Sequence, residues 1–340
     1  MSEITQTNGK QVTSVDFKAV TARYAADMER VEKDIHRHFA SDVAMIPAVS
    51  GYLISGGGKR IRPLLLIASS RLCGYTGATR HITMSVVAEY IHAATLLHDD
   101  VVDEADLRRG AASANAKYGN EASVLVGDFL FAKSFELMSE DGDVRVIRVI
   151  SGATKCLAEG EVLQLYNTCN VEVSEEAYMD TIYRKTGALI EACCRSGSIL
   201  GGASSEKEQA LALYGKNIGT AFQLVDDVLD YIGEAKSWGK PIGADLADGK
   251  VTLPLITTLK QCTEAERETI AGAIEGDDDV KEKLARVMPI LEKYNALSHT
   301  MDTAREHADE AKNALASAFE PSEHLEALSS IADYIVSRSV

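Results

Sequence analysis

Two aspartate-rich clusters, each placed directly after an apolar run, constrain this chain more than any other feature. Their members are Asp99, Asp100 and Asp103 in HDDVVDEADLRRG and Asp226, Asp227 and Asp230 in QLVDDVLDY. Residues four apart share one face of a helix, so the spacing stacks like charges above one another. A single DDxxD is usually a solvated acidic face. Two copies, each following buried-looking residues, favour paired cation sites instead.

The chemistry of these clusters indicates the cation. Carboxylates without cysteine or paired histidine suit a hard ion such as Mg²⁺, which takes one or two carboxylates and completes its shell with water and phosphate oxygens. Arg108 and Arg109 follow the first cluster, and guanidinium groups bind the phosphate oxygens that a metal leaves free. The net charge of −16 argues against nucleic acid as a partner, because phosphate binding otherwise needs a basic surface.

The pattern of the chain predicts helices throughout. Only six prolines occur, and no run alternates as a strand would. We expect a loose segment over 1–15 and one all-α domain over 16–340, because no sequence break divides the rest. The predicted helices cover 16–39, a segment from Arg62 onward, 81–104, 113–139, 144–168, 175–200, 206–232, one that begins in VTLPLITTLK, and four shorter helices in 263–340.

Several cationic side chains are placed where an anion would suit them. Lys59 and Arg62 lie behind three glycines at the start of a helix, where backbone N–H groups favour an anion. A glycine turn with two solvated cations is the alternative, and the spacing is not that of a P-loop. His92 shares the face of the first cluster, but a lone histidine there is as often a core residue. Lys185 stands in a mostly apolar helix, where it either meets an anion or snorkels to the surface.

A long irregular loop, EAKSWGKPIGADLADGK, follows the second cluster and carries Lys240 and Lys250. A loop of this length in a compact domain is more often functional or mobile than filler.

The six cysteines form no CxxC pair and no zinc spacing, so we expect buried thiols in a reducing cytoplasm. The N-terminus lacks the features of a signal peptide, and no apolar run is long enough to span a membrane. We therefore expect a cytoplasmic protein without stable membrane insertion.

Six segments together carry a family resemblance: GGGKRIRP, HDDVVDEADLRRG, VLVGDFLF, KTG, FQLVDDVLDY and GKPIGADLADGKVTLPL. In this order, over residues 45 to 260, they resemble the trans-polyprenyl diphosphate synthases, and the wording around Asp99 resembles the long-chain octaprenyl and decaprenyl type. The resemblance implies an all-α bundle of roughly a dozen helices around a deep central cavity (the isoprenoid synthase type), working as a homodimer.

The resemblance also implies a reaction and its residues. A Mg²⁺-dependent enzyme, with two or three ions, would repeatedly condense isopentenyl diphosphate head-to-tail onto farnesyl or geranylgeranyl diphosphate, giving a long all-trans chain for a quinone. The isopentenyl diphosphate site would comprise Lys59, Arg62, His92 and Arg109. The allylic diphosphate would meet Arg108, Lys185, Thr186, Gln223, Lys240 and Lys250. The main metal ligands would be Asp99, Asp103 and Asp226, with Asp100, Asp227 and Asp230 as further partners. The residues expected to act directly on the leaving group are Asp99, Asp103, Arg108, Lys185, Asp226 and Lys240.

Ala94 and Thr95 precede the first cluster by five and four residues, where short-chain members of the family carry bulky aromatics. Small residues there predict an open tunnel and a long product, unless they only allow close helix packing. A geranylgeranyl diphosphate synthase and a non-catalytic subunit of a heteromeric synthase remain alternatives. A terpene cyclase would not need the second diphosphate site of Lys59, Arg62 and His92.

Overall fold

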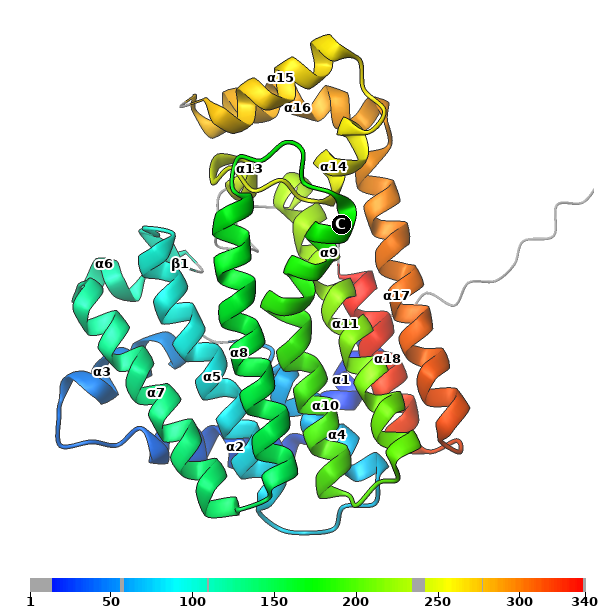
Figure 1. The fold of residues 1–340 in the computed structure, drawn as a ribbon. Helices are drawn as coiled ribbons and strands as arrows, with labels where there is room; N and C mark the ends of the chain where they lie inside the picture. The colour runs from blue at the N-terminus through cyan, green and yellow to red at the C-terminus, as the bar shows by residue number, and fades with distance from the viewer. Residues whose placement is uncertain (1–13, 56–57, 109, 234–241, 277, 339–340) are drawn as a thin grey trace, which may run out of the picture.

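The computed structural model describes residues 14–55, 58–108, 110–233, 242–276 and 278–338, and it confirms an all-helical architecture (Figure 1). Long, roughly parallel helices form the body of the molecule, and a smaller helical layer lies across one end. Lys240 and Arg109, both predicted to contact substrate, lie outside the described residues.

The centre of the bundle is formed by four helices that bury long runs of their residues. These are α4 (Ile61–Leu72), α5 (Arg80–Val102), α10 (Ala188–Leu200) and α11 (Ser205–Ile232). Helix α10 packs against both α4 and α11. A helix surrounded by other helices must be apolar all round, and almost every residue of α4 and α10 is buried.

Further helices enclose this centre. They are α1 (Ser14–Arg23), α2 (Ala25–His38), α3 (Met45–Ser55), α6 (Ala114–Tyr118), α7 (Asn120–Asp141), α8 (Val144–Asn167), α9 (Glu175–Ile182), α17 (Ala296–Ala318) and α18 (Glu323–Ser337). The layer at the end of the bundle consists of α13 (Ala244–Ala247), α14 (Leu253–Leu259), α15 (Glu264–Glu275) and α16 (Val280–Lys293). Helix α13 lies against the end of α11, since Gly243 donates its N–H to the Asp230 carbonyl.

Most predicted helices are present, but three are subdivided. The helix expected over 16–39 divides at Tyr24, and the one over 113–139 divides at Gly119, whose φ of 90° is not helical. The helix over 175–200 contains a π-helical turn, η1 (Tyr183–Gly187). Two antiparallel strands of two residues each, β1 (Leu107–Arg108) and β2 (Ala111–Ala112), follow α5. They are too short for an alternation of apolar and polar residues to predict them.

Candidate active site

Two aspartates of each cluster line one hollow of about 310 Å³ at the end of the bundle. The predicted site residues that line it are Arg62, His92, Asp99, Asp103, Arg108, Lys185, Thr186, Gln223, Asp226, Asp227 and Lys250. They come from α4, α5, η1 and α11, from β1, and from the segment before α14. Side chains far apart in the sequence therefore meet where the resemblance implies a diphosphate site.

The first cluster occupies the last turn of α5. Asp99 and Asp103 line the hollow, and burial together with the nearby Glu161 carboxylate raises the pKa of Asp99 to about 7. Asp100 is buried and does not line the hollow. It accepts hydrogen bonds from Arg108 Nε at 2.8 and 2.9 Å, and Arg108 Nη2 lies 2.6 Å from its Oδ1. Asp100 thus orients the arginine that reaches the hollow.

The second cluster lies near the end of α11. Asp227 is buried, where it accepts hydrogen bonds from the Tyr178 hydroxyl and from Gln223 Nε2 (2.8 Å). The Gln223 carbonyl in turn accepts from the Thr186 hydroxyl at 2.8 Å. Burial, followed by the charge of Asp245, raises the pKa of Asp227 well above its ordinary value. This chain of bonds fixes the positions of Thr186 and Gln223 in the wall of the hollow.

Asp230 does not line the hollow. Its carboxylate accepts hydrogen bonds from the backbone N–H groups of Ala244 (3.2 Å) and Asp245 (3.1 Å). It therefore holds the start of α13, and with it Asp245, against the end of the bundle.

Asp226 has a partner that sequence reasoning missed. The guanidinium of Arg338, from the end of the chain, lies 3.0 Å from the Asp226 carboxylate and is 8% exposed. It also stacks 4.0 Å from the centroid of the Phe222 ring and donates to the Phe222 carbonyl. Burial nevertheless raises the pKa of Asp226 to about 6, against the opposing effect of Arg338.

Lys185 is held toward the hollow by the π turn. Its Nζ lies 2.7 Å from a Glu161 carboxylate oxygen, and its charge opposes the rise in the pKa of Asp99. Glu161 stands on α8, one residue after Gly160, where an added Cβ would lie 2.8 Å from the Lys185 backbone nitrogen. The helix carrying Lys185 can approach α8 this closely only because residue 160 is glycine.

Lys250 faces the first cluster from the opposite side. Its ammonium lies 3.5 Å from Asp103 and 2.9 Å from Asp248. Burial alone would lower the pKa of Lys250, but the surrounding carboxylates of Asp245, Asp103 and Asp248 outweigh burial and raise it. The lysine therefore stays charged where a diphosphate would lie.

The glycine-rich segment contributes Arg62 to the hollow. Its Nε is buried without a hydrogen-bond partner among the described residues, and burial lowers the pKa of its guanidinium. His92, from α5, lines the same hollow. Lys59 is exposed, with its Nζ 4.9 Å from the Tyr334 ring centroid, and lies near enough to Asp226 to oppose the rise in its pKa.

The donor set fits Mg²⁺ that is bound together with substrate. No three His, Cys, Asp or Glu side chains of the described chain converge into a ready-made metal site. Mg²⁺ does not require one, since it takes one or two carboxylates and phosphate oxygens. Asp99 and Asp226 both have raised pKa values in the hollow, chiefly because burial disfavours their charged forms. A divalent cation bound beside them would favour those charged forms.

The proposed chain-length residues lie beside the hollow but do not line it. Ala94 is fully buried in the hydrophobic core. Thr95 is half-buried and donates its hydroxyl to the His92 carbonyl at 2.9 Å. Leu96, the next residue, does line the hollow. The tunnel stays a prediction.

Glu161, Tyr178, Asp245 and Arg338 belong to the site although they were not predicted. Asp245 lies in the segment GADLADGK, whose acidic residues could have indicated it. Tyr178 and Arg338 carried no local signal, because each reaches the site through tertiary packing.

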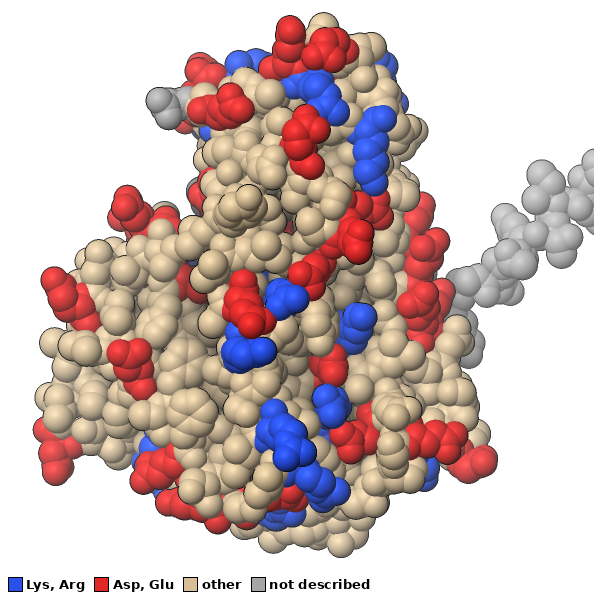
Figure 2. Space-filling view, viewed as in Figure 1, with Lys and Arg blue, Asp and Glu red and all other residues tan. Residues whose placement is uncertain are grey.

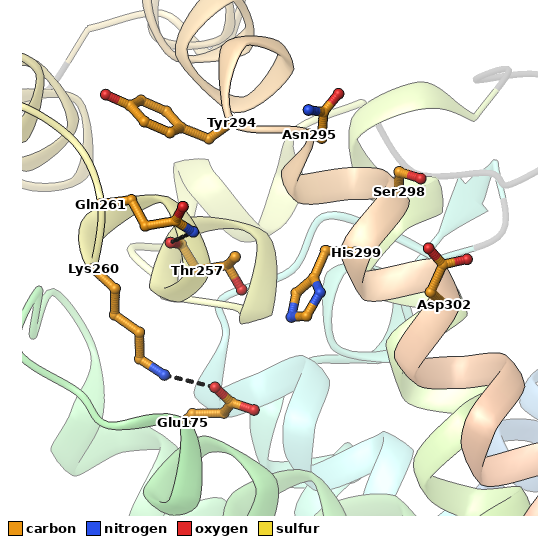
Figure 3. Close-up of a pocket in the computed structure, with 9 residues that line it drawn as sticks. All are labelled: Glu175, Thr257, Lys260, Gln261, Tyr294, Asn295, Ser298, His299 and Asp302. Carbon is orange, nitrogen blue, oxygen red and sulfur yellow. Dashed lines mark hydrogen bonds and ion pairs between the residues drawn. The ribbon is translucent and has the colours of Figure 1, made fainter.

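A second hollow, of about 400 Å³, shares no lining residue with the first. Figure 3 shows Lys260 paired with Glu175 on one side. On the other side lie Asn295, which precedes α17, and Ser298 and His299 on α17. Its two basic and two acidic side chains do not form a diphosphate site.

No helix in the described part of the chain combines the length and apolar character needed to cross a bilayer.

Comparisons with known proteins find relatives that match most of the chain. The polyprenyl synthetase family model matches residues 43–291. Octaprenyl diphosphate synthase from Escherichia coli (strain K12) is 43% identical over 301 residues, which are 88% of this chain and 93% of that one.

Two solved structures are also similar. A polyprenyl synthase from Caulobacter crescentus CB15, complexed with calcium and isoprenyl diphosphate, matches with a TM-score of 0.91 and 40% identity over 97% of this chain and 99% of that one. A decaprenyl diphosphate synthase from Rhodobacter capsulatus matches with a TM-score of 0.89 and 41% identity over 95% and 99%.

Proposed function

Because the chain belongs to the polyprenyl synthetase family, we propose that it is a long-chain trans-polyprenyl diphosphate synthase. It condenses isopentenyl diphosphate repeatedly onto an allylic diphosphate such as farnesyl or geranylgeranyl diphosphate. The observation that carries this proposal is the single hollow in which two aspartate clusters face Arg108, Lys185 and Lys250.

The demanding step is separation of the allylic diphosphate from its carbon. The C–O bond breaks, its electrons leave with the diphosphate, and a resonance-stabilised allylic cation remains. Asp99, Asp103 and Asp226 would hold Mg²⁺, which would neutralise charge on the oxygens of the leaving group. Arg108 and Lys185 donate hydrogen bonds to the same oxygens, and these bonds strengthen as negative charge develops.

The second substrate completes the reaction. Its diphosphate binds Arg62, His92 and Lys59, which places its double bond beside the allylic cation. A new C–C bond forms, and a proton leaves the adjacent carbon to the departing diphosphate. No side-chain nucleophile is needed. The apolar bundle below the hollow keeps the cation away from water.

Arg109 and Lys240 belong to the same proposal through the resemblance alone. We also propose that the enzyme uses two or three Mg²⁺ ions and that its product becomes a quinone side chain. We propose a cytoplasmic location for it.

The long product is supported by the octaprenyl and decaprenyl relatives. Some more distant relatives are named for shorter chains, for example a geranylgeranyl diphosphate synthase from Saccharolobus solfataricus at 33% identity. We expect Ala94→Phe or Thr95→Phe to shorten the product, because an aromatic ring would block a tail running down α5. An unchanged product profile in both variants would contradict this tunnel path.

We further propose a homodimer built on α7 and α8. Exposed apolar side chains gather on these two helices: Leu125, Phe135, Val144, Val162, Leu165 and Tyr166. Figure 2 shows few charged side chains over α7. An apolar surface of this kind indicates a protein contact.

The experiment that tests the activity measures transfer of labelled isopentenyl diphosphate into extractable lipid. Incorporation should require both an allylic starter and Mg²⁺, and EDTA should abolish it. Incorporation without a starter, or undiminished incorporation in EDTA, would contradict the proposed reaction. Absence of incorporation, together with a normal fold, would favour a non-catalytic subunit.

A further inference from the structure

Arg60 stands between the two substrate-binding cations Lys59 and Arg62 but faces away from the hollow. It is the residue that precedes α4, with φ 46° and ψ 42°, and its side chain does not cap the helix. An L-residue in this left-handed conformation is strained, because its Cβ lies too close to the following carbonyl oxygen. Such a conformation persists only where its surroundings hold it.

Hydrogen bonds from the side chain of Arg60 keep the backbone in this conformation. Its Nε donates to Glu32 on α2 at 2.6 Å, and its Nη1 donates to Glu89 on α5 at 2.6 Å. Its Nη2 also lies 3.3 Å from both Glu32 and the Ile54 carbonyl. The side chain of Glu89 is only 6% exposed and that of Arg60 only 14%. One guanidinium thus joins the glycine-rich segment to two helices.

Glu89 links this anchor to the substrate site. It lies one turn before His92 on α5, and its charge stabilises the buried guanidinium of Arg62. Anchoring Arg60 on the α2 and α5 side leaves Arg62 to line the hollow and Lys59 to lie near Asp226. The left-handed backbone at Arg60 lets its side chain point toward α2 and α5, while the side chains of Lys59 and Arg62 point elsewhere.

We propose that Arg60 is a positioning residue for the isopentenyl diphosphate site, acting through its ion pairs with Glu32 and Glu89. The inference rests on the proposed function, because that function assigns Lys59, Arg62 and His92 to the second substrate. Arg60 does not touch substrate. It fixes the backbone from which two substrate contacts extend, and a displacement of about 1 Å at such contacts can cost up to a hundredfold.

The test is steady-state kinetics of Arg60→Gln and Arg60→Gly with each substrate varied separately. Both variants lose the ion pairs, but glycine adopts a positive φ without strain. We expect KM for isopentenyl diphosphate to rise about tenfold or more in both, with KM for the allylic substrate within about twofold of wild type. Glu89→Gln, which keeps the shape of the side chain, should raise the same constant less.

Arg80→Gln is the matched control. Arg80 also bridges two carboxylates, with Nε 2.6 Å from Asp141 and Nη2 3.2 Å from Asp143, but it lies at the other end of α5. Its loss should lower the melting temperature without changing either KM. If Arg60→Gln does not fold, Arg60→Lys and Glu89→Gln give the same comparison, since one ammonium cannot bridge two carboxylates as a guanidinium does.

An unchanged KM for isopentenyl diphosphate in Arg60→Gly would overturn the inference, and so would an equal rise for both substrates. Failure of the wild-type protein to elongate any starter is a different result, which would refute the proposed function.

Discussion

Asp99 and Asp226 bind a proton more tightly than an ordinary aspartate, and this has a consequence for stability. The pKa of Asp99 rises from 3.8 to about 7 on folding in the metal-free protein. A carboxyl group with a raised pKa stabilises the fold fully below its unfolded pKa, and this contribution is lost as the pH rises through the folded pKa. The contribution of Asp99 to the stability of the metal-free protein should therefore be lost between about pH 4 and pH 7.

Asp99→Asn removes the charge that causes this loss. We expect the metal-free variant to melt roughly 2 °C or more above wild type at pH 8 and to show a flatter dependence of melting temperature on pH. Thermal unfolding in EDTA from pH 5 to pH 8 measures both effects. Asp302→Asn, at the second hollow, is the control. A slope as steep as that of wild type in Asp99→Asn would show that Asp99 is not the titrating group.

The same two carboxylates are expected to hold the metal. Asp99→Ala and Asp226→Ala should each lower turnover about a hundredfold or more, by analogy with the loss of one oxyanion donor. Labelled incorporation measures the loss, and circular dichroism checks that the helices remain. Asp302→Ala should keep normal activity. Near-normal turnover in both cluster variants would show that the metal assignment is wrong.

At the residue scale, the sequence predicted which residues gather at the site better than what each of them contacts. The i, i+4 spacing correctly brings Asp99 and Asp103 to the hollow. The same spacing cannot show that Asp100 turns to Arg108 or that Asp230 binds the start of α13. Those contacts depend on the path of the chain after each helix. Arg338 reaches Asp226 from more than 100 residues away, so only the tertiary fold reveals it.

At the element scale, the position of Lys185 depends on the π turn η1. This turn packs between Gly160 of α8 and Gly219 of α11. An added Cβ at Gly160 would lie 2.7 Å from Arg184 Cβ, and one at Gly219 would lie 2.5 Å from the Gly187 Cα. Both contacts are closer than atoms tolerate. The turn therefore fits only because α8 and α11 each present a glycine to it.

Gly160→Ala should displace this turn. We expect a loss of about 1–3 kcal/mol in the free energy of unfolding, as in other overpacked cores, and lower turnover because Lys185 moves. Gly152→Ala is the matched control on the same helix, since its Cβ would meet no atom within 4 Å. The control should keep its activity and gain slightly in stability. Equal behaviour of the two variants would refute the role given to Gly160.

Apolar periodicity predicted where most helices lie, but it did not predict where a helix breaks or changes its hydrogen-bond pattern. The ranges predicted for α5, α8 and α11 agree with the structure within two residues. The break at Gly119 has a positive φ that apolar periodicity does not reveal, and periodicity does not separate the π turn YRKTG from the helices on either side of it. Helix α3 was not predicted, and its short apolar run lies just before the glycine-rich segment.

At the scale of the whole molecule, the exposed apolar side chains of α7 and α8 predict self-association. Leu125→Glu and Val162→Glu should shift the protein to a monomer, because a buried unpaired charge is costly. Light scattering after gel filtration measures the mass. Leu213→Glu changes an equally apolar but separate site on α11, and it should leave the mass unchanged. Unaltered dimers in both test variants would exclude this surface as the interface.

The measurement that tests the central claim most directly is the length of the product. Purified protein would be incubated with Mg²⁺, farnesyl diphosphate and labelled isopentenyl diphosphate, and the extracted chains would be sized. We predict products of about forty carbons or more. Products that stop at twenty carbons would retain the chemistry of the two aspartate clusters but contradict a long-chain synthase. No elongation from any allylic starter would contradict the catalytic function itself.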